Sequence, residues 1–123
     1  MDLDYKKIML ELINKERKSN GVHELEYYYD GQILADTRAD ELVEEFSHTR
    51  PDGSEWHTIF NDYEVSYNVI GENIASGYTT PESVMKDWMG SYGHRSNILD
   101  SEYDYVIVGY NAAGNCWVQL FLG

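Results

Sequence analysis

The last part of the sequence most constrains the fold. It contains two runs rich in β-branched and aromatic residues, "YVIVGYN" and "NCWVQLFLG", separated by the small residues "AAG". Such runs on either side of a short link are typical of a β-hairpin. The apolar faces of a small sheet have to be covered by other elements. We therefore look in the rest of the chain for helices that could cover them.

Two segments in the first half have helical periodicity. From Asp4 to Asn20 the apolar residues recur with i, i+3, i+4 spacing, and Gly21 is well placed to end the helix. A second helix is expected from Asp30 to Phe46, with one apolar face (Ala35, Ala39, Leu42, Val43, Phe46) and a largely polar face (Asp36, Arg38, Asp40, Glu44).

Shorter elements follow the second helix. Pro51 and the pair Asp52-Gly53 break the chain in "SHTRPDG", and Ser54 is a candidate N-cap for a short helix in "SEWHTIFNDY". "YNVIGENIASG" suits a short strand that changes direction better than a long one. Thr80-Pro81-Glu82 then has the cap, first-turn proline and acidic residue that open a helix. The order of elements indicates an α+β domain, and we expect one domain over residues 1–123.

Composition excludes several classes of protein. The 22 acidic and 9 basic residues give a net charge of −13, so nucleic acid and anionic membrane surfaces would be repelled. The 14% aromatic content argues for a packed core instead of a disordered acidic chain. The single cysteine, Cys116, excludes an internal disulfide and lies in an apolar run that favours burial. We find no stretch that could cross a membrane, and "MDLDYKK" lacks an apolar secretory core.

Three residues at the ends of predicted elements could carry chemistry: His48 in "SHTRPDG", Glu72 in "IGENIASG" and His94 in "YGHRSNIL". If they converge, His48 and His94 could ligate zinc or another divalent cation, with Glu72 orienting a ring or acting as base to a bound water. Alternatively, Glu72 could set the tautomer of a histidine for acid-base chemistry without a metal. Spacing alone does not decide whether they converge, and each histidine could simply satisfy a local partner.

The segments "SHTRPDG", "GENIASG", "VMKDWMGSYGHRSNIL" and "VGYNAAGNCWVQLF", in this order, resemble the CAP superfamily of cysteine-rich secretory proteins, antigen 5 and pathogenesis-related proteins. The compact bacterial branch is the most similar. This resemblance implies an α-β-α sandwich with a small, mainly antiparallel sheet, and a cleft lined by two histidines and two glutamates. His48, Glu72 and His94 match three members of that tetrad and are the candidate catalytic residues.

The fourth member of the tetrad is absent from the matching position. In eukaryotic members the second glutamate follows the helix tryptophan, and the corresponding position after Trp88 is Ser91. A serine is neutral and a weak metal ligand, so the matching positions offer three protein ligands and leave open positions for water.

Other side chains have two interpretations each. Asn73, Arg95 and Ser91 are candidate ligand contacts, although Asn73 could be a turn former and Arg95 a structural ion pair. Asn97 is expected to brace its loop. Trp88 and Trp117 are assigned to the core. The tyrosines of "EYYYD" could form an aromatic patch for a partner or lead into a half-exposed helix. Ser54 and Ser91 lack the G-x-S-x-G context of a serine hydrolase.

We therefore expect an exported or cell-surface, monomeric CAP domain whose cleft binds a divalent metal or small ligand. One alternative is a metal-assisted hydrolase, such as a peptidase, in which Glu72 activates water. Another is an interaction module for a protein or lipid, as the resemblance to eukaryotic members suggests.

Overall fold

A small sheet forms the centre of the protein in the computed structural model, which describes residues 5–123. Its strands are β1 (Glu26–Tyr27), β2 (Ile70–Ser76), β3 (Tyr105–Asn111) and β4 (Cys116–Leu122), in the order β1-β3-β4-β2. β3 and β4 are the expected antiparallel hairpin, in register from Tyr105 opposite Leu122 to Asn111 opposite Cys116. The parallel pairing of β1 with β3 is too short to have been expected from periodicity.

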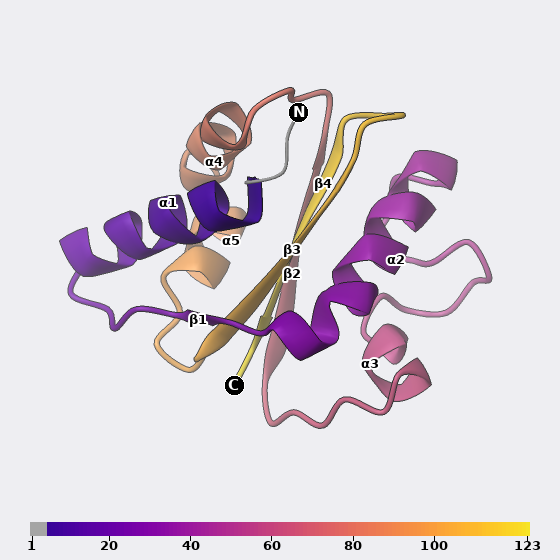
Figure 1. Ribbon diagram of the computed structural model, residues 1–123, viewed down its shortest axis with the longest axis horizontal. Coiled ribbons are helices and arrows are strands. Elements are labelled where there is room, and N and C mark those ends of the chain that lie inside the picture. The colour runs from indigo at the N-terminus through magenta and orange to yellow at the C-terminus, as the bar shows by residue number, and fades with distance from the viewer. Residues whose placement is uncertain (1–4) are drawn as a thin grey trace.

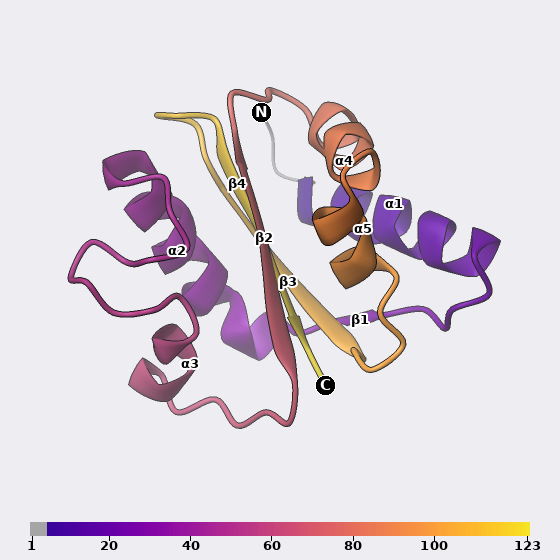
Figure 2. The same ribbon diagram turned by 180° about the vertical axis from the view of Figure 1, so that it is seen from behind.

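Helices cover both faces of this sheet, as Figures 1 and 2 show. On one face lie α1 (Tyr5–Ser19), α4 (Pro81–Met89) and α5 (Tyr92–Ile98). On the other lie α2 (Gln32–Glu44) and α3 (Thr58–Asp62), with the 3-10 turn η1 (Tyr29–Gly31) leading into α2. The expected α-β-α sandwich is therefore correct. The expected first helix began at Asp4, which lies outside the described residues.

The observed β2 differs from the short strand expected here, because it does not change direction. Its seven residues pair continuously with β4, from Ile70 opposite Leu122 to Ser76 opposite Cys116. Gly71 is needed for packing, since a Cβ there would overlap the Tyr103 hydroxyl. The chain turns only at Gly77, which has a φ of +90°.

The ends of the helices differ in how well they were predicted. Thr80 caps α4 as expected, accepting a hydrogen bond from the Ser83 amide at 3.1 Å. Ser54 does not cap α3, because its amide and hydroxyl both donate to Asp52, and α3 begins only after His57. α2 ends at Glu44, which leaves Phe46 51% exposed instead of on the expected buried face.

The core lies in two layers, one on each side of the sheet. Trp88 and Trp117 are both fully buried in the layer under α1, α4 and α5, as expected. Cys116 is buried in the other layer with Leu42 and Phe60, and burial raises the pKa of its thiol. The largest correction concerns Arg38, which was expected on the polar face of its helix and is fully buried.

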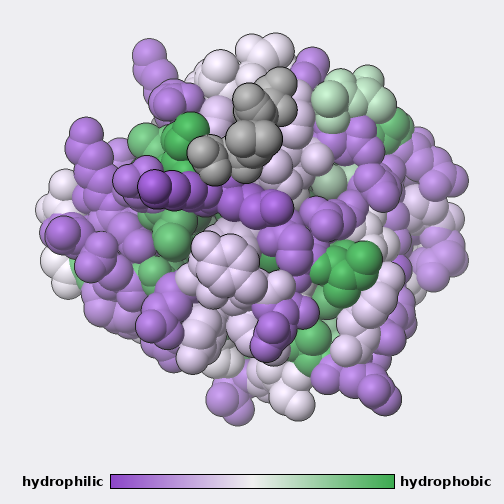
Figure 3. Space-filling model, in the orientation of Figure 1, coloured by the Kyte–Doolittle hydropathy of each residue, from purple (hydrophilic) through white to green (hydrophobic). Residues whose placement is uncertain are grey.

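The face of the protein seen in Figure 3 is mainly hydrophilic. On the face seen in Figure 3, hydrophobic residues gather only in separated patches. Across residues 5–123, no helix combines the length and apolar character needed to span a membrane.

Candidate functional site at the free edge of strand β2

The candidate site lies at the edge of the sheet formed by β2, which within residues 5–123 pairs only with β4. Neighbouring residues of a strand point to opposite faces of the sheet. Glu72 contacts the α2 layer, whereas Asn73 contacts α5. His48 follows α2, and His94 is the third residue of α5. The two residues therefore come from the helical layers that Figure 2 shows on opposite sides of β2.

Both carboxylate oxygens of Glu72 are occupied. Arg38 donates to Oε2 from Nε at 2.7 Å and to Oε1 from Nη2 at 3.1 Å. The side chains of Arg38 and Glu72 are both fully buried. His48 Nδ1 lies 2.8 Å from Oε1 of the same carboxylate. The contacts of Glu72 are therefore a bidentate ion pair with one partner and a hydrogen bond with the other.

Arg38 is one member of a chain of alternating charges that leads away from Glu72. Its Nη1 donates a hydrogen bond to Glu41 at 2.9 Å. Glu41 also accepts a hydrogen bond from Arg50, and Arg50 donates another to Asp62 at 2.7 Å. Burial lowers the pKa of Arg38, but the bonds to Glu72 and Glu41 outweigh it and raise that pKa overall. Hydrogen bonds with Glu41 raise the pKa of Arg50. Both guanidinium groups are thus held charged.

His48 is the more open of the two imidazoles, with 53% of its side chain exposed. A carboxylate next to Nδ1 favours the proton on that nitrogen. In this tautomer Nε2 carries the lone pair. This is the arrangement that orients a histidine as a metal ligand or as a base.

His94 is partly buried, so its surroundings differ from those of the exposed His48. Burial lowers its pKa, Asp87 raises it and the charge of His48 lowers it, with burial the largest influence. Its Nδ1 is buried and finds no hydrogen-bond partner within residues 5–123. Its ring lies 6.4 Å from that of Trp88, between centroids. The imidazole is therefore neutral at pH 7, with one nitrogen unsatisfied by the protein.

Asn73 and Asn97 connect β2 to α5. Asn73 is fully buried, and its amide donates to the His94 carbonyl at 3.1 Å and to Gln119 at 3.0 Å. Asn97 donates to the Asn73 side chain at 2.9 Å and to the Glu72 carbonyl at 3.4 Å. Trp88 donates a hydrogen bond to the Ile74 carbonyl. Asn97 and Trp88 together therefore cover part of the free edge of β2. Asn73 thus lies in a strand, with its side chain buried, and braces the site.

The remaining sequence candidates lie at the margin of the site or outside it. Ser91 is the N-cap residue of α5 and lines a hollow with Tyr78 and Asp87. Arg95 is exposed and points to Asn20 at the end of α1, at 3.4 Å. Asp87 is the acidic residue that acts on His94, although it does not occupy the position of the missing tetrad glutamate.

The donor set limits which metal sites are feasible. Within the described part of the chain, no three His, Cys, Asp or Glu side chains lie close enough together to hold a metal ion. The expected option of three protein ligands is therefore not met. A metal site with His48 and His94 as its protein ligands would leave its other positions to water or to a bound ligand.

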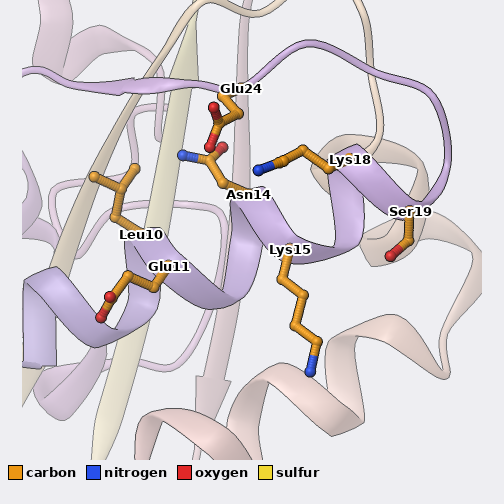
Figure 4. Close-up of a pocket in the computed structure, with 7 residues that line it drawn as sticks. All are labelled: Leu10, Glu11, Asn14, Lys15, Lys18, Ser19 and Glu24. Carbon is orange, nitrogen blue, oxygen red and sulfur yellow. The ribbon is translucent and has the colours of Figure 1, made fainter.

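One hollow of the protein lies elsewhere. It has a volume of about 550 Å³ and lies along α1, lined by Leu10, Glu11, Asn14, Lys15, Lys18, Ser19 and Glu24 (Figure 4). The Asn14 side chain is used structurally, because it bonds to both the carbonyl and the amide of Leu25. The charged residues of this hollow have mixed signs, so it selects no ligand charge.

The comparisons with known proteins agree with this fold. The sequence model of the Cysteine-rich secretory protein family, CAP, matches residues 10–121. The chain belongs to the CAP family. It is 36% identical over 121 residues to the uncharacterized protein YkwD of Bacillus subtilis (strain 168), covering 97% of this chain and 47% of that protein. It therefore spans less than half the length of that CAP relative.

Solved structures show the same fold. An extracellular SCP-domain protein from Bacillus anthracis superposes with a TM-score of 0.89 at 22% identity, over 96% of this chain and 40% of the other. An outer surface protein from Borrelia burgdorferi gives 0.83 at 24% identity, over 94% and 90% of the two chains. At these identities the match supports the CAP fold only.

Proposed function

We propose that this CAP domain works outside the cytoplasm as a binding domain, and that its cleft takes a divalent cation between His48 and His94. The observation that carries the proposal is the hydrogen bond between His48 Nδ1 and buried Glu72, at 2.8 Å. Metal-ligating histidines commonly donate their second ring nitrogen to a carboxylate in this way. A neutral His94 suits the same role, because only an unprotonated imidazole nitrogen can bind a metal.

Binding fits the site better than hydrolysis does. A general base needs a free lone pair within reach of a water molecule. Glu72 is fully buried, and its two oxygens accept from Arg38 and His48. The charge of Glu72 is thus used to hold neighbouring groups. The extracellular location is supported by the printed descriptions of the Bacillus anthracis and Borrelia burgdorferi proteins.

Isothermal titration calorimetry with zinc chloride tests the proposal. Wild type should release heat of binding, His48→Ala and His94→Ala should lose most of it, and His57→Ala should retain it. His57 is a matched control because it lies outside the cleft, at the start of α3. Affinity should also fall as the pH is lowered and the imidazoles protonate. Equal heats in all variants would exclude metal binding between these histidines and would leave a small organic ligand as the candidate.

A further inference from the structure

Three tyrosines from separate segments line a further hollow, which contains none of His48, Glu72 and His94. Tyr28 follows β1, Tyr67 precedes β2 and Tyr105 belongs to β3. Together with Ser66, Asn68, Leu122 and Gly123 they enclose about 320 Å³. The sequence "EYYYD" had suggested either an aromatic patch or the start of a helix, and Tyr28 contributes to such a patch.

The aromatic walls of this tyrosine hollow are fixed by their packing. The Tyr28 ring lies directly against Gly31, where a Cβ would overlap it. Its centroid is 5.8 Å from that of Tyr105, with an angle of 59° between the rings. Tyr67 meets the fully buried Phe60 edge to face, at 5.4 Å. A ligand would thus meet a largely preformed surface and lose little affinity to ordering it.

The lining side chains suit a hydroxylated ligand. Charged residues make up 25% of the chain, yet none of the side chains that line the hollow is charged. The structure gives no hydrogen-bond partner within residues 5–123 to the hydroxyls of Tyr28, Tyr67 and Tyr105. The same is true of the side chains of Ser66 and Asn68. Aromatic faces next to free donors and acceptors suit a ligand that has both C–H faces and hydroxyl groups.

We propose that the tyrosine hollow binds a neutral carbohydrate. One or two sugar rings stack their C–H faces on the tyrosines, and their hydroxyls bond to Ser66, Asn68 and the phenol groups. The volume is at the small end for ligand pockets, which matches this size. A proline-rich peptide is the other ligand typical of aromatic grooves, but its extended helix rises about 3.1 Å per residue and needs a longer groove.

An NMR titration of the ¹⁵N-labelled protein tests the proposal, with cellotetraose, chitotriose and a proline-rich peptide as probes. We expect one or both oligosaccharides, at millimolar concentration, to shift the amide signals around Tyr28, Tyr67 and Tyr105. Tyr67→Ala and Tyr105→Ala should each weaken this binding about tenfold or more. Tyr105→Phe should weaken it less, because it keeps the ring. Tyr92→Ala should have no effect, since Tyr92 is 87% exposed on α5 and outside the hollow.

The measurement also has outcomes that overturn the proposal. It fails if neither sugar shifts these signals, if the shifts lie elsewhere, or if only the proline-rich peptide binds at the hollow. Unchanged binding in both alanine variants overturns it as well. Two alanine variants are used because Tyr67 lies in a loop and Tyr105 in a strand, so a folding defect in one leaves the other informative.

Discussion

At the scale of single residues, the cleft depends on Glu72 and on the group that neutralises it. Arg38 has no exposed surface, so its charge must be balanced inside the protein. Glu72 supplies part of the negative charge that balances Arg38, and it also accepts a hydrogen bond from His48. One carboxylate thereby sets both the packing of α2 against β2 and the orientation of an exposed imidazole.

Glu72→Gln should therefore be strongly destabilising. It leaves Arg38 buried with one of its two carboxylate partners removed, and breaking a buried ion pair typically costs about 3–5 kcal/mol. Urea denaturation measures the loss of unfolding free energy. His48→Ala is the control, because it leaves the Arg38–Glu72 pair intact and removes a side chain that is 53% exposed. A loss below about 1 kcal/mol in Glu72→Gln would contradict the central role of this pair.

The lowered pKa of His94 predicts that the stability of the protein depends on pH. Its pKa in the folded protein lies below the reference value of 6.5, mainly because of burial. As the pH falls, the unfolded chain therefore takes up the proton first. The contribution of His94 is fully present above about pH 6.5 and is lost as the pH drops from there through the lower, folded pKa.

Denaturation curves between neutral and mildly acidic pH check this prediction. The unfolding free energy of wild type should fall more over this range than that of His94→Gln, which cannot take up the proton. His57→Gln, outside the cleft, should follow wild type. Parallel curves for wild type and His94→Gln would show that His94 is not held neutral by the fold.

At the scale of elements, the regular parts of the sandwich could be predicted and the contacts between them could not. The hairpin and α4 follow from β-branched runs and from a Thr-Pro-Glu start, which are local signals. The length of β2 was missed, because its first glycine, Gly71, is explained by a close contact with Tyr103 from another segment. Contacts of this kind have no local signature in the sequence.

The packing of α2 on β3 gives a prediction at this scale. Gly109 has no room for a side chain, because a Cβ there would overlap the Ala35 carbonyl oxygen of α2. Gly109→Ala must push the helix away from the sheet, so we expect a loss of about 1–3 kcal/mol. Thermal unfolding followed by circular dichroism measures it. Gly90→Ala is the matched control, because its nearest neighbours would be at 3.5 Å, an ordinary contact. Equal melting temperatures for the two variants would argue against such close packing.

At the scale of the whole molecule, the net charge of −13 opposes the compact state. Added salt screens this repulsion, with a Debye length of about 10 Å at 0.1 M. We therefore expect the melting temperature to rise from low to physiological sodium chloride. A variant with the exposed Glu44 and Glu45 both changed to glutamine should respond less. A melting temperature that falls with salt would mean that favourable ion pairs, such as Arg50–Asp62, outweigh the repulsion.

The candidate site was only partly predictable for a reason that concerns the whole fold. His48, Glu72 and His94 were found through the family resemblance, since they are far apart in the sequence. Arg38 was missed because helical periodicity placed it with Asp36 and Asp40 on the polar side. The nearby Glu41 and the later Glu72 were the only available signals that its charge would be balanced in the interior. The tyrosine hollow likewise joins segments that only the tertiary structure brings together.

The position of β2 also determines when the cleft can form as the protein is made. In the part of the chain that the structure describes, β2 pairs only with β4, which comes after β3 in the sequence. A nascent chain that has emerged only as far as Asn97 contains His48, Glu72 and His94, but it lacks the strand that holds Glu72 in place. The cleft must then appear together with the finished sheet, and a ribosome-bound intermediate that lacks Cys116–Leu122 has the residues of the site without its geometry.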